Sequence, residues 1–368
     1  MASAQIGMQL LHGTDAGARR RFVTEIHRLR GVAILLIVGA HCYQFFDWSR
    51  HPAAEAFFKD TFDNSSLIFI FVTGFLFQHT EEVGFRYGAY LLRKLENVLV
   101  PFAIALAPAL LYAAFRGRGE FAVVPPWGSG AAAYAFFSLV YPGQTMNYAL
   151  WFIPVITIYY VFSPLLRAFD RRHWYWLLVV LMPLSVLMHR PTYAYGHNLS
   201  LAAYFLSSQV LGMSISRYWT ATTAWLERRT VAVSLLFGLV FVGHLLLADH
   251  HGKSTTAEPF ETQGADGLID WIYVQKLLMV AVLVGFLHFT RERSARALDF
   301  IADASFTIFF YHLYFLYVLR WVTHFGPVEF RIDYFLVLFA LAIAGPCLIV
   351  LAARRFVPRW SRMLVGAN

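Results

Sequence analysis

The sequence predicts an all-α fold, a polytopic membrane helix bundle of about ten transmembrane helices with both termini cytoplasmic. Two observations predict it: 58% of the 368 residues are hydrophobic, and only 14% are charged, against about one quarter in an ordinary soluble protein. The formal net charge of +8 comes from basic residues scattered between long apolar runs. This composition excludes a disordered chain, a nucleic-acid partner and a disulfide scaffold, and the two cysteines indicate no metal site.

Ten segments are long and apolar enough to be transmembrane helices, because a helix needs about 20 mostly apolar residues to cross the hydrocarbon core. In chain order they are 29–47, 64–81, 96–115, 148–168, 174–190, 200–217, 230–248, 269–289, 301–321 and 333–353. An eleventh apolar stretch, 131–141, is too short to span, and we interpret it as an interfacial or re-entrant piece.

The distribution of lysine and arginine supports this count, since these residues are retained on the cytoplasmic side. With the N-terminus inside, every inside segment carries at least three basic residues and no outside segment carries more than two. One missed helix would destroy that alternation. The sequence therefore predicts a polar cytoplasmic tail over 1–27, a transmembrane domain over 28–354 and a basic cytoplasmic tail over 355–368.

The first helix carries two ionisable residues, Arg30 and His41, where lipid disfavours them. At 100° per residue, eleven positions place both side chains within about 20° of one helix face and about 16 Å apart along the axis. A snorkelling arginine at a helix end would explain Arg30 without any function. A neutral imidazole in lipid still needs two polar partners, so His41 is the stronger candidate for a functional residue.

The ninth helix repeats this pattern with Ser305 and His312, which are seven residues apart and share a face. Here the alternative is structural, because a Ser–His stripe can simply hold helices together through hydrogen bonds. Three other histidines of the membrane zone, His79, His244 and His288, lie near predicted helix ends, where the ring can reach water, and we interpret them as structural.

Several further candidates are less specific when taken alone. Arg93 and Lys94 precede the third span, where basic residues can hold a phosphate-bearing ligand but are also what the positive-inside rule requires. Trp151 lies where an interfacial tryptophan is common, and Thr73 precedes a glycine in an ordinary small-residue pattern of helix packing.

Taken in order, these segments resemble acyltransferase family 3, integral-membrane enzymes that O-acylate sugars and surface polysaccharides. Thr73 stands where that family usually has serine, and Asn97 stands at a position that is often basic. The resemblance covers residues 25–325 and is carried by RLRGVAILLIVGAH, FIFVTGFLF, LRKLENVLVPF, LWFIPVI and ASFTIFFYH.

The resemblance implies a multi-pass protein of the bacterial cytoplasmic membrane that uses acetyl-CoA, or another acyl-CoA, as donor substrate and has no tightly bound cofactor. The acceptor would be a hydroxyl of a glycan or lipid-linked saccharide at the outer side, as in O-acetylation of envelope polysaccharide. Arg30, Arg93 and Lys94 would bind the CoA phosphates, with Arg30 and His41 catalytic. Membrane lipid, a second copy of the chain or envelope biosynthesis proteins are the expected further partners.

The chemistry at His41 has two routes, general-base activation of the sugar hydroxyl or a transient acyl-histidine, and the sequence does not choose between them. The candidate substrate-binding residues are Trp151, Thr73, Ser305 and His312. An oxyanion donor could be Thr73, Ser305 or a backbone N–H, and Trp151 could stack on a sugar ring. Two alternatives to an enzyme remain. A transporter or flippase of a polysaccharide precursor would use the same intramembrane Arg and His, whereas a non-catalytic scaffold would leave both unexplained.

Overall fold

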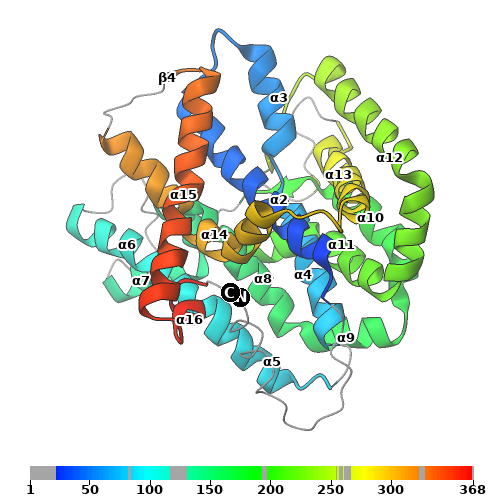
Figure 1. Cartoon of the computed structure of the whole chain (residues 1–368), viewed down its shortest axis with the longest axis horizontal. Helices are drawn as coiled ribbons and strands as arrows, with labels where there is room; N and C mark the ends of the chain where they lie inside the picture. Colours follow the sequence, from blue (N-terminus) through cyan, green and yellow to red (C-terminus); the bar gives the residue numbers. More distant parts are fainter. Residues whose placement is uncertain are drawn as a thin grey trace.

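The computed structural model describes residues 22–81, 84–116, 131–192, 197–253, 255–256, 260, 267–322 and 328–366. The predicted N-terminal tail lies outside these residues up to position 21, and the first described helix begins at Thr24. The α-helices, shown in Figure 1, are α2 (Thr24–Cys42), α3 (Pro52–Phe62), α4 (Ser66–Glu81), α5 (Tyr87–Lys94), α6 (Val100–Arg116), α7 (Ala131–Val140), α8 (Phe152–Val161), α9 (Ser163–Arg171), α10 (Leu178–Met188), α11 (Asn198–Arg217), α12 (Trp219–Leu247), α13 (Trp271–Phe289), α14 (Arg296–Val322), α15 (Ile332–Phe356) and α16 (Ser361–Val365).

All ten predicted spans are helical, and the predicted all-α polytopic bundle is confirmed. Among the described residues, seven helices are long and apolar enough to cross a membrane. An eighth span would combine Tyr148–Val161 with Ser163–Arg171, which meet at a bend of 55°. The two remaining segments are short: α4 has 16 residues, and the helix over Trp174–Met188 also falls below the length of a full span. The short stretch near 131–141 is the ten-residue helix α7.

Helix α2 runs through the middle of the bundle, with α12 at one edge of the view and α15 on the other side of α2 (Figure 1). It packs against α14, α4, α13, α15 and α3 through fully buried side chains such as Leu29, Ile34 and Val38. By contrast, α12 presents bare apolar side chains such as Leu239 and Leu246, which are 71% and 75% exposed. In a membrane protein this outer surface faces lipid, so the polar residues of α2 lie in the interior of the protein.

The closest helix pair is α4 with α11, which approach at two glycines. A side chain at Gly74 would collide with the Gln209 carbonyl oxygen, and one at Gly212 would collide with the Phe71 carbonyl oxygen. Small residues permit this approach between membrane helices. The approach also brings the Thr73 hydroxyl within 2.8 Å of Gln209 Oε1, to which it is hydrogen bonded. The Thr-Gly pair of the sequence thus fixes the position of a polar group inside the bundle.

Two-residue strands tie the loops together at the His41 end of α2. Strand β1 (Phe46–Asp47) pairs in parallel with β4 (Val328–Glu329), and β2 (Arg190–Pro191) pairs in parallel with β3 (Thr255–Thr256). Lys276 lies within α13, and its ammonium donates to the carbonyls of Asp60 and Thr61 at 2.9 and 2.6 Å. It thereby satisfies carbonyls at the C-terminal end of α3, which have no partner within that helix.

The chain folds back onto the bundle after its last long helix. Helix α16 packs against α6 and against η2 (Leu95–Leu99), a π-helical turn between α5 and α6. Its position is held by a 2.7 Å hydrogen bond from the Thr307 hydroxyl to the Val365 carbonyl. The π-helical turn has a local cause, because Pro101 has no N–H to donate to the carbonyl four residues earlier.

Candidate active site

A cavity of about 340 Å³ opens at the Arg30 end of α2, and we call it the basic cavity. Three of the residues that the sequence singles out as cations, Arg30, Arg93 and Lys94, line it together with Thr73. Arg362 of α16 adds a fourth cation, whereas Glu81 is the one carboxylate among the lining residues. The basic cavity is therefore an anion-binding environment built from α2, α4, α5 and the C-terminal helix.

Three of the four cations of the basic cavity contact neighbouring groups. The Arg30 Nε donates to the carbonyl of Ala302 at 3.0 Å, which leaves the other guanidinium nitrogens free of any hydrogen bond that the described residues show. Arg93 forms an ion pair with Glu81 at 2.6 Å. The Lys94 ammonium lies 5.2 and 5.0 Å from the ring centroids of Tyr90 and Tyr160, in cation–π geometry.

Arg30 also lines a second and larger cavity of about 770 Å³ at the same end of the helix. This neighbouring cavity contains Arg28 and Asp299, which form an ion pair at 2.7 Å, and also His27 and Asp303. Arg30 thus stands where two polar cavities meet, and their combined size is enough for a ligand much longer than a single phosphate group.

His41 lies at the opposite end of α2 and lines a separate pocket of about 50 Å³, which we call the His41 pocket. Its Nδ1 is 3.2 Å from the Tyr148 hydroxyl, and that hydroxyl donates to Gln44 Oε1 at 3.0 Å. Since the tyrosine proton is committed to Gln44, the Tyr148 oxygen accepts from His41 Nδ1–H. The other ring nitrogen, Nε2, is then the unprotonated one and can act as a base.

Of the predicted pair on α14, His312 lies beside this imidazole. The ring centroids of His312 and His41 are 5.1 Å apart, and His312 is fully buried. Its Nδ1 is within 2.9 and 3.0 Å of the Ile308 and Phe309 carbonyls, whereas its Nε2 has no hydrogen-bond partner among the described residues. The buried Ser305 hydroxyl is likewise unsatisfied there. Unsatisfied buried polar groups are rare, but neither His312 nor Ser305 lines the basic cavity or the His41 pocket, so their expected contact with substrate stays a prediction.

Three phenylalanine rings, which we call the aromatic wall, lie between the two cavities. Phe69 lines the basic cavity, whereas Phe152 and Phe309 line the His41 pocket, and no residue lines both. The ring centroids are 5.8 Å apart for Phe69 and Phe152, 6.4 Å for Phe69 and Phe309, and 5.4 Å for Phe152 and Phe309. A ligand that reaches from one cavity to the other must therefore displace these rings.

Comparison with known proteins adds one match. Residues 23–351, nearly the whole chain, match a family model described as an acyltransferase domain. The chain belongs to acyltransferase family 3. No curated protein and no solved structure matches it. The resemblance inferred from the sequence motifs is thereby confirmed, and this acyltransferase family 3 member is a membrane-bound acyltransferase.

The structure brings together the segments that resemble the family motifs. One end of α2 supplies Arg30 to the basic cavity, where Thr73, Arg93 and Lys94 join it, and the other end supplies His41. Trp151 reaches the His41 pocket but is only 7% exposed, because Phe205 stacks near its ring and Arg190 lies over it. Its expected contact with a sugar ring stays a prediction.

Sequence reasoning did not identify Tyr148, Gln209, Arg362, Arg190 or Lys253, all of which line one of the two cavities. Tyr148 lies three residues before Trp151, just outside the quoted motif LWFIPVI, so an aromatic hydroxyl close to a motif residue could have indicated it. The other four could not be recognised, because their places depend on contacts between segments far apart in the chain.

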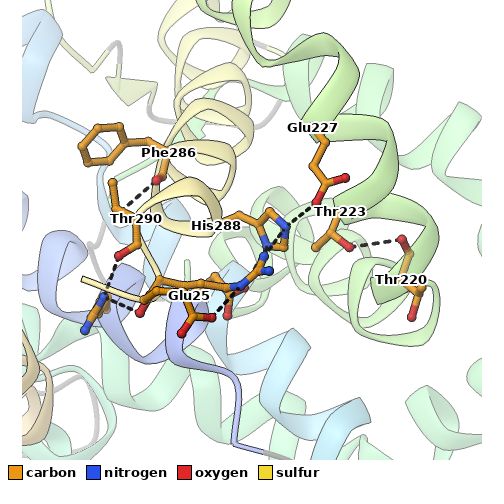
Figure 2. Close-up of polar contacts among 10 residues, drawn as sticks. Glu25, Thr220, Thr223, Glu227, Phe286, His288 and Thr290 are labelled. Carbon is orange, nitrogen blue, oxygen red and sulfur yellow. Dashed lines mark hydrogen bonds and ion pairs between the residues drawn. The ribbon is translucent and has the colours of Figure 1, made fainter. Parts of the chain in front are cut away.

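Two histidines interpreted as structural have structural contacts. His288 bridges α2 and α12, with Nδ1 2.9 Å from Glu25 Oε1 and Nε2 3.0 Å from Glu227 Oε1, as Figure 2 shows. At the other end of the bundle, His244 Nδ1 donates to Asp60 Oδ2 at 2.9 Å. These contacts attach α12 to α2 and α3.

The one group of side chains in the described residues whose ligand atoms could hold a metal ion is Asp60, His244 and His251, with ligand atoms within 4.8 Å of one another. Both imidazole Nδ1 atoms lie at hydrogen-bond distance from Asp60 Oδ2, and the Gly252 amide donates to Oδ1. The carboxylate is satisfied by these contacts, so we interpret the cluster as the attachment of a loop to α3.

Proposed function

We propose that this acyltransferase transfers an acyl group, most simply acetyl, from cytoplasmic acyl-CoA to a hydroxyl of a glycan or lipid-linked saccharide at the outer face of the bacterial cytoplasmic membrane. The observation that carries the proposal is the pairing of the basic cavity with a free imidazole nitrogen at the other end of the same helix. The positive-inside rule assigns the basic cavity to the cytoplasm, where CoA is available.

The basic cavity suits the phosphate groups of the donor. Arg30, Arg93 and Arg362 each carry a planar guanidinium, which can hold a phosphate through two parallel hydrogen bonds. Lys94 adds a point charge. The thioester arm would then extend along α2, past the aromatic wall, toward His41, a helical rise of about 16 Å from Arg30.

In the transfer step, His41 Nε2 takes the proton of the acceptor hydroxyl while the oxygen bonds to the acyl carbon. The carbon–sulfur bond breaks, and CoA leaves as a thiolate that recovers the proton from the imidazolium. The same nitrogen could instead attack the acyl carbon first and form an acyl-histidine, which the hydroxyl then resolves. In either route, Tyr148 holds the ring in the tautomer that the chemistry requires.

The test is acyl transfer by purified protein in proteoliposomes, supplied with radiolabelled acetyl-CoA and an envelope polysaccharide fraction. We expect His41→Ala to reduce transfer by about 100-fold or more, the usual contribution of a general base. His250→Ala is the matched control, because His250 is exposed and lines neither cavity. Near-normal transfer by His41→Ala would refute the catalytic role, and uptake of label without transfer would instead support a transporter.

The donor site is tested separately by acyl-CoA binding. We expect Arg30→Ala and Arg93→Ala each to weaken acetyl-CoA binding, with Arg30→Lys recovering only part of it, since a lysine cannot hold a phosphate bidentately. Arg50→Ala is the control, because this exposed residue lies beyond the His41 end of α2. An unchanged dissociation constant in both cavity variants would rule out a phosphate role for them.

A further inference from the structure

The His41 pocket contains an arginine that none of the steps above uses. Arg190 is only 4% exposed, and its Nε is buried with no hydrogen-bond partner among the described residues. Strand β2 places it there by pairing with β3, in the register Arg190 with Thr255. Its guanidinium lies 4.8 Å from the centroid of Trp151, and no ion pair to it is seen in the part of the chain that the structure describes. A buried guanidinium with so few partners is costly unless a ligand compensates it.

Lys253 adds a second positive charge to the same pocket. Its backbone N–H donates to Asp63 Oδ2 at 3.1 Å, but no described residue accepts a hydrogen bond from its ammonium. Burial lowers the pKa of Lys253, as does the nearby charge of Arg190, while the Asp63 carboxylate acts in the opposite direction. The two cations are therefore near enough to act on one group.

The pocket does not supply enough negative charge to compensate these cations. Asp63 is the one carboxylate among its lining residues, and it already accepts from the Tyr43 hydroxyl at 2.8 Å and from the Lys253 amide. Asn64, next to it, donates to the Tyr204 hydroxyl at 2.6 Å, and its Oδ1 is unsatisfied in the described residues. Two cations thus face a single carboxylate that is already hydrogen bonded.

We infer that the His41 pocket binds a negatively charged group, a carboxylate or a phosphate, carried by the saccharide that accepts the acyl group. The inference rests on the proposed function and names the class of its acceptor, an acidic saccharide. A pocket of about 50 Å³ has room for a small anionic group but not for a whole sugar ring. Arg190 and Lys253 hold the anion, and this fixes which hydroxyl of the sugar reaches His41 Nε2.

The test compares two acceptors that differ at C6, where methyl glucuronoside carries a carboxylate and methyl glucoside carries an uncharged hydroxymethyl group. We expect the wild-type protein to prefer the glucuronoside by at least tenfold in kcat/KM. Arg190→Met should remove most of that preference through a higher KM for the glucuronoside, with a smaller change in the KM for the glucoside. Arg190→Lys should retain part of the preference, and Arg50→Met, at an exposed position, should retain all of it. Lys253→Met provides a second variant of the two cations in the His41 pocket, and its position in a loop leaves the helices of the bundle unaltered.

Two results would overturn the inference: equal kcat/KM for the two acceptors in the wild type, or an equal fall of kcat for both in Arg190→Met. The second would mean that the cation stabilises the oxyanion of the reacting carbonyl instead.

Binding of an anion in the absence of acyl-CoA separates this inference from the proposed function. Free glucuronate and inorganic phosphate should each raise the Tm of the wild type and raise that of Arg190→Met less. No Tm shift with either anion would count against the pocket. An Arg190-dependent shift without acyl transfer to either saccharide would retain the anion site and reject the proposed transfer to a saccharide hydroxyl.

Discussion

The tautomer of a single imidazole determines what the His41 pocket can do. His41 Nδ1–H donates to Tyr148, whose own proton is donated to Gln44, so the chain of hydrogen bonds has one direction. Nε2 is left free on the side of the ring that can meet a substrate. His312 lies nearby with its own Nε2 unsatisfied, so the neighbourhood contains two ring nitrogens that can accept a proton.

This arrangement predicts the effect of Tyr148→Phe. The variant keeps the ring and removes the oxygen that accepts from His41, so the imidazole loses its preferred tautomer and orientation. We expect kcat to fall by about tenfold, less than on removal of the base itself, with KM for acetyl-CoA unchanged. Tyr87→Phe is the control, since Tyr87 lines neither cavity and its hydroxyl donates to the Val161 carbonyl. A steady-state assay decides, and an unaltered kcat in Tyr148→Phe would contradict the assignment.

Sequence reasoning reached part of this site and missed the rest for a physical reason. Arg30 and His41 lie on one helix, where 100° per residue fixes which positions share a face. Tyr148 contacts His41 across 107 positions of sequence, and no periodicity links the two. The same holds for Arg190 and Lys253, which meet only because β2 pairs with β3.

At the scale of helices, the contact between α4 and α11 determines the position of Thr73. Gly74→Ala places a methyl group against the Gln209 carbonyl, and the helices can only separate or distort. We expect a loss of about 1–3 kcal/mol in the free energy of unfolding, the usual cost of overpacking. Gly88→Ala is the control, because nothing lies within 4 Å of a Cβ there.

Thermal unfolding in detergent measures this difference. The Gly88→Ala protein should stay within about 1 kcal/mol of the wild type, the size of the intrinsic preference of a helix for alanine. A Gly74→Ala protein that unfolds at the wild-type temperature would show that the two helices are able to move apart without cost.

Helix α3 and the loop after α12 are joined by one carboxylate, and this predicts a dependence of stability on pH. Burial favours the neutral acid, but hydrogen bonds from His244 and the Gly252 amide outweigh it, so the pKa of Asp60 is lowered. A carboxyl group with a lowered pKa in the folded state stabilises the protein above its ordinary pKa, and that contribution is lost as the pH falls below about 4.

The Asp60→Asn variant should therefore have a lower Tm at neutral pH, and its Tm should fall less steeply below pH 4 than that of the wild type. Asp249→Asn, an exposed change on the same segment, serves as control. The measurement is Tm against pH for the three proteins. If the Tm of Asp60→Asn and that of the wild type fell equally steeply below pH 4, this carboxylate would not contribute to the dependence of stability on pH.

Hydropathy predicted which segments form helices, but it did not predict which of them are single unbroken helices. The eighth candidate span bends because Pro164, the second residue of α9, has no N–H to donate to the preceding turn, so α8 ends at Val161. Helix α16 has five residues, too few for any periodic pattern, and was predicted only as part of a basic tail. Its contribution of Arg362 to the basic cavity depends on tertiary packing.

For the molecule as a whole, the remaining prediction is its orientation in the bilayer. The proposal requires the basic cavity to face the cytoplasm and the loops near Arg50 to face outward. Both natural cysteines are at least partly buried, so a single introduced cysteine can be labelled selectively. Arg50 and Arg359 are both exposed, so labelling at either position reports the side of the membrane on which it lies. In intact cells, a membrane-impermeant maleimide should label Arg50→Cys and not Arg359→Cys. Labelling of only the second variant would reverse the orientation and reject the proposed direction of transfer.

The aromatic wall also has a consequence for the bilayer in which the enzyme works. A continuous column of water through the bundle would conduct protons and discharge the electrical potential that the cell maintains across this membrane. Because the rings of Phe69, Phe152 and Phe309 stand between the two cavities, such a column is interrupted near its middle. In the proposed reaction, every turnover would pass an acyl chain between these apolar rings without admitting water, and a short chain would displace the rings least.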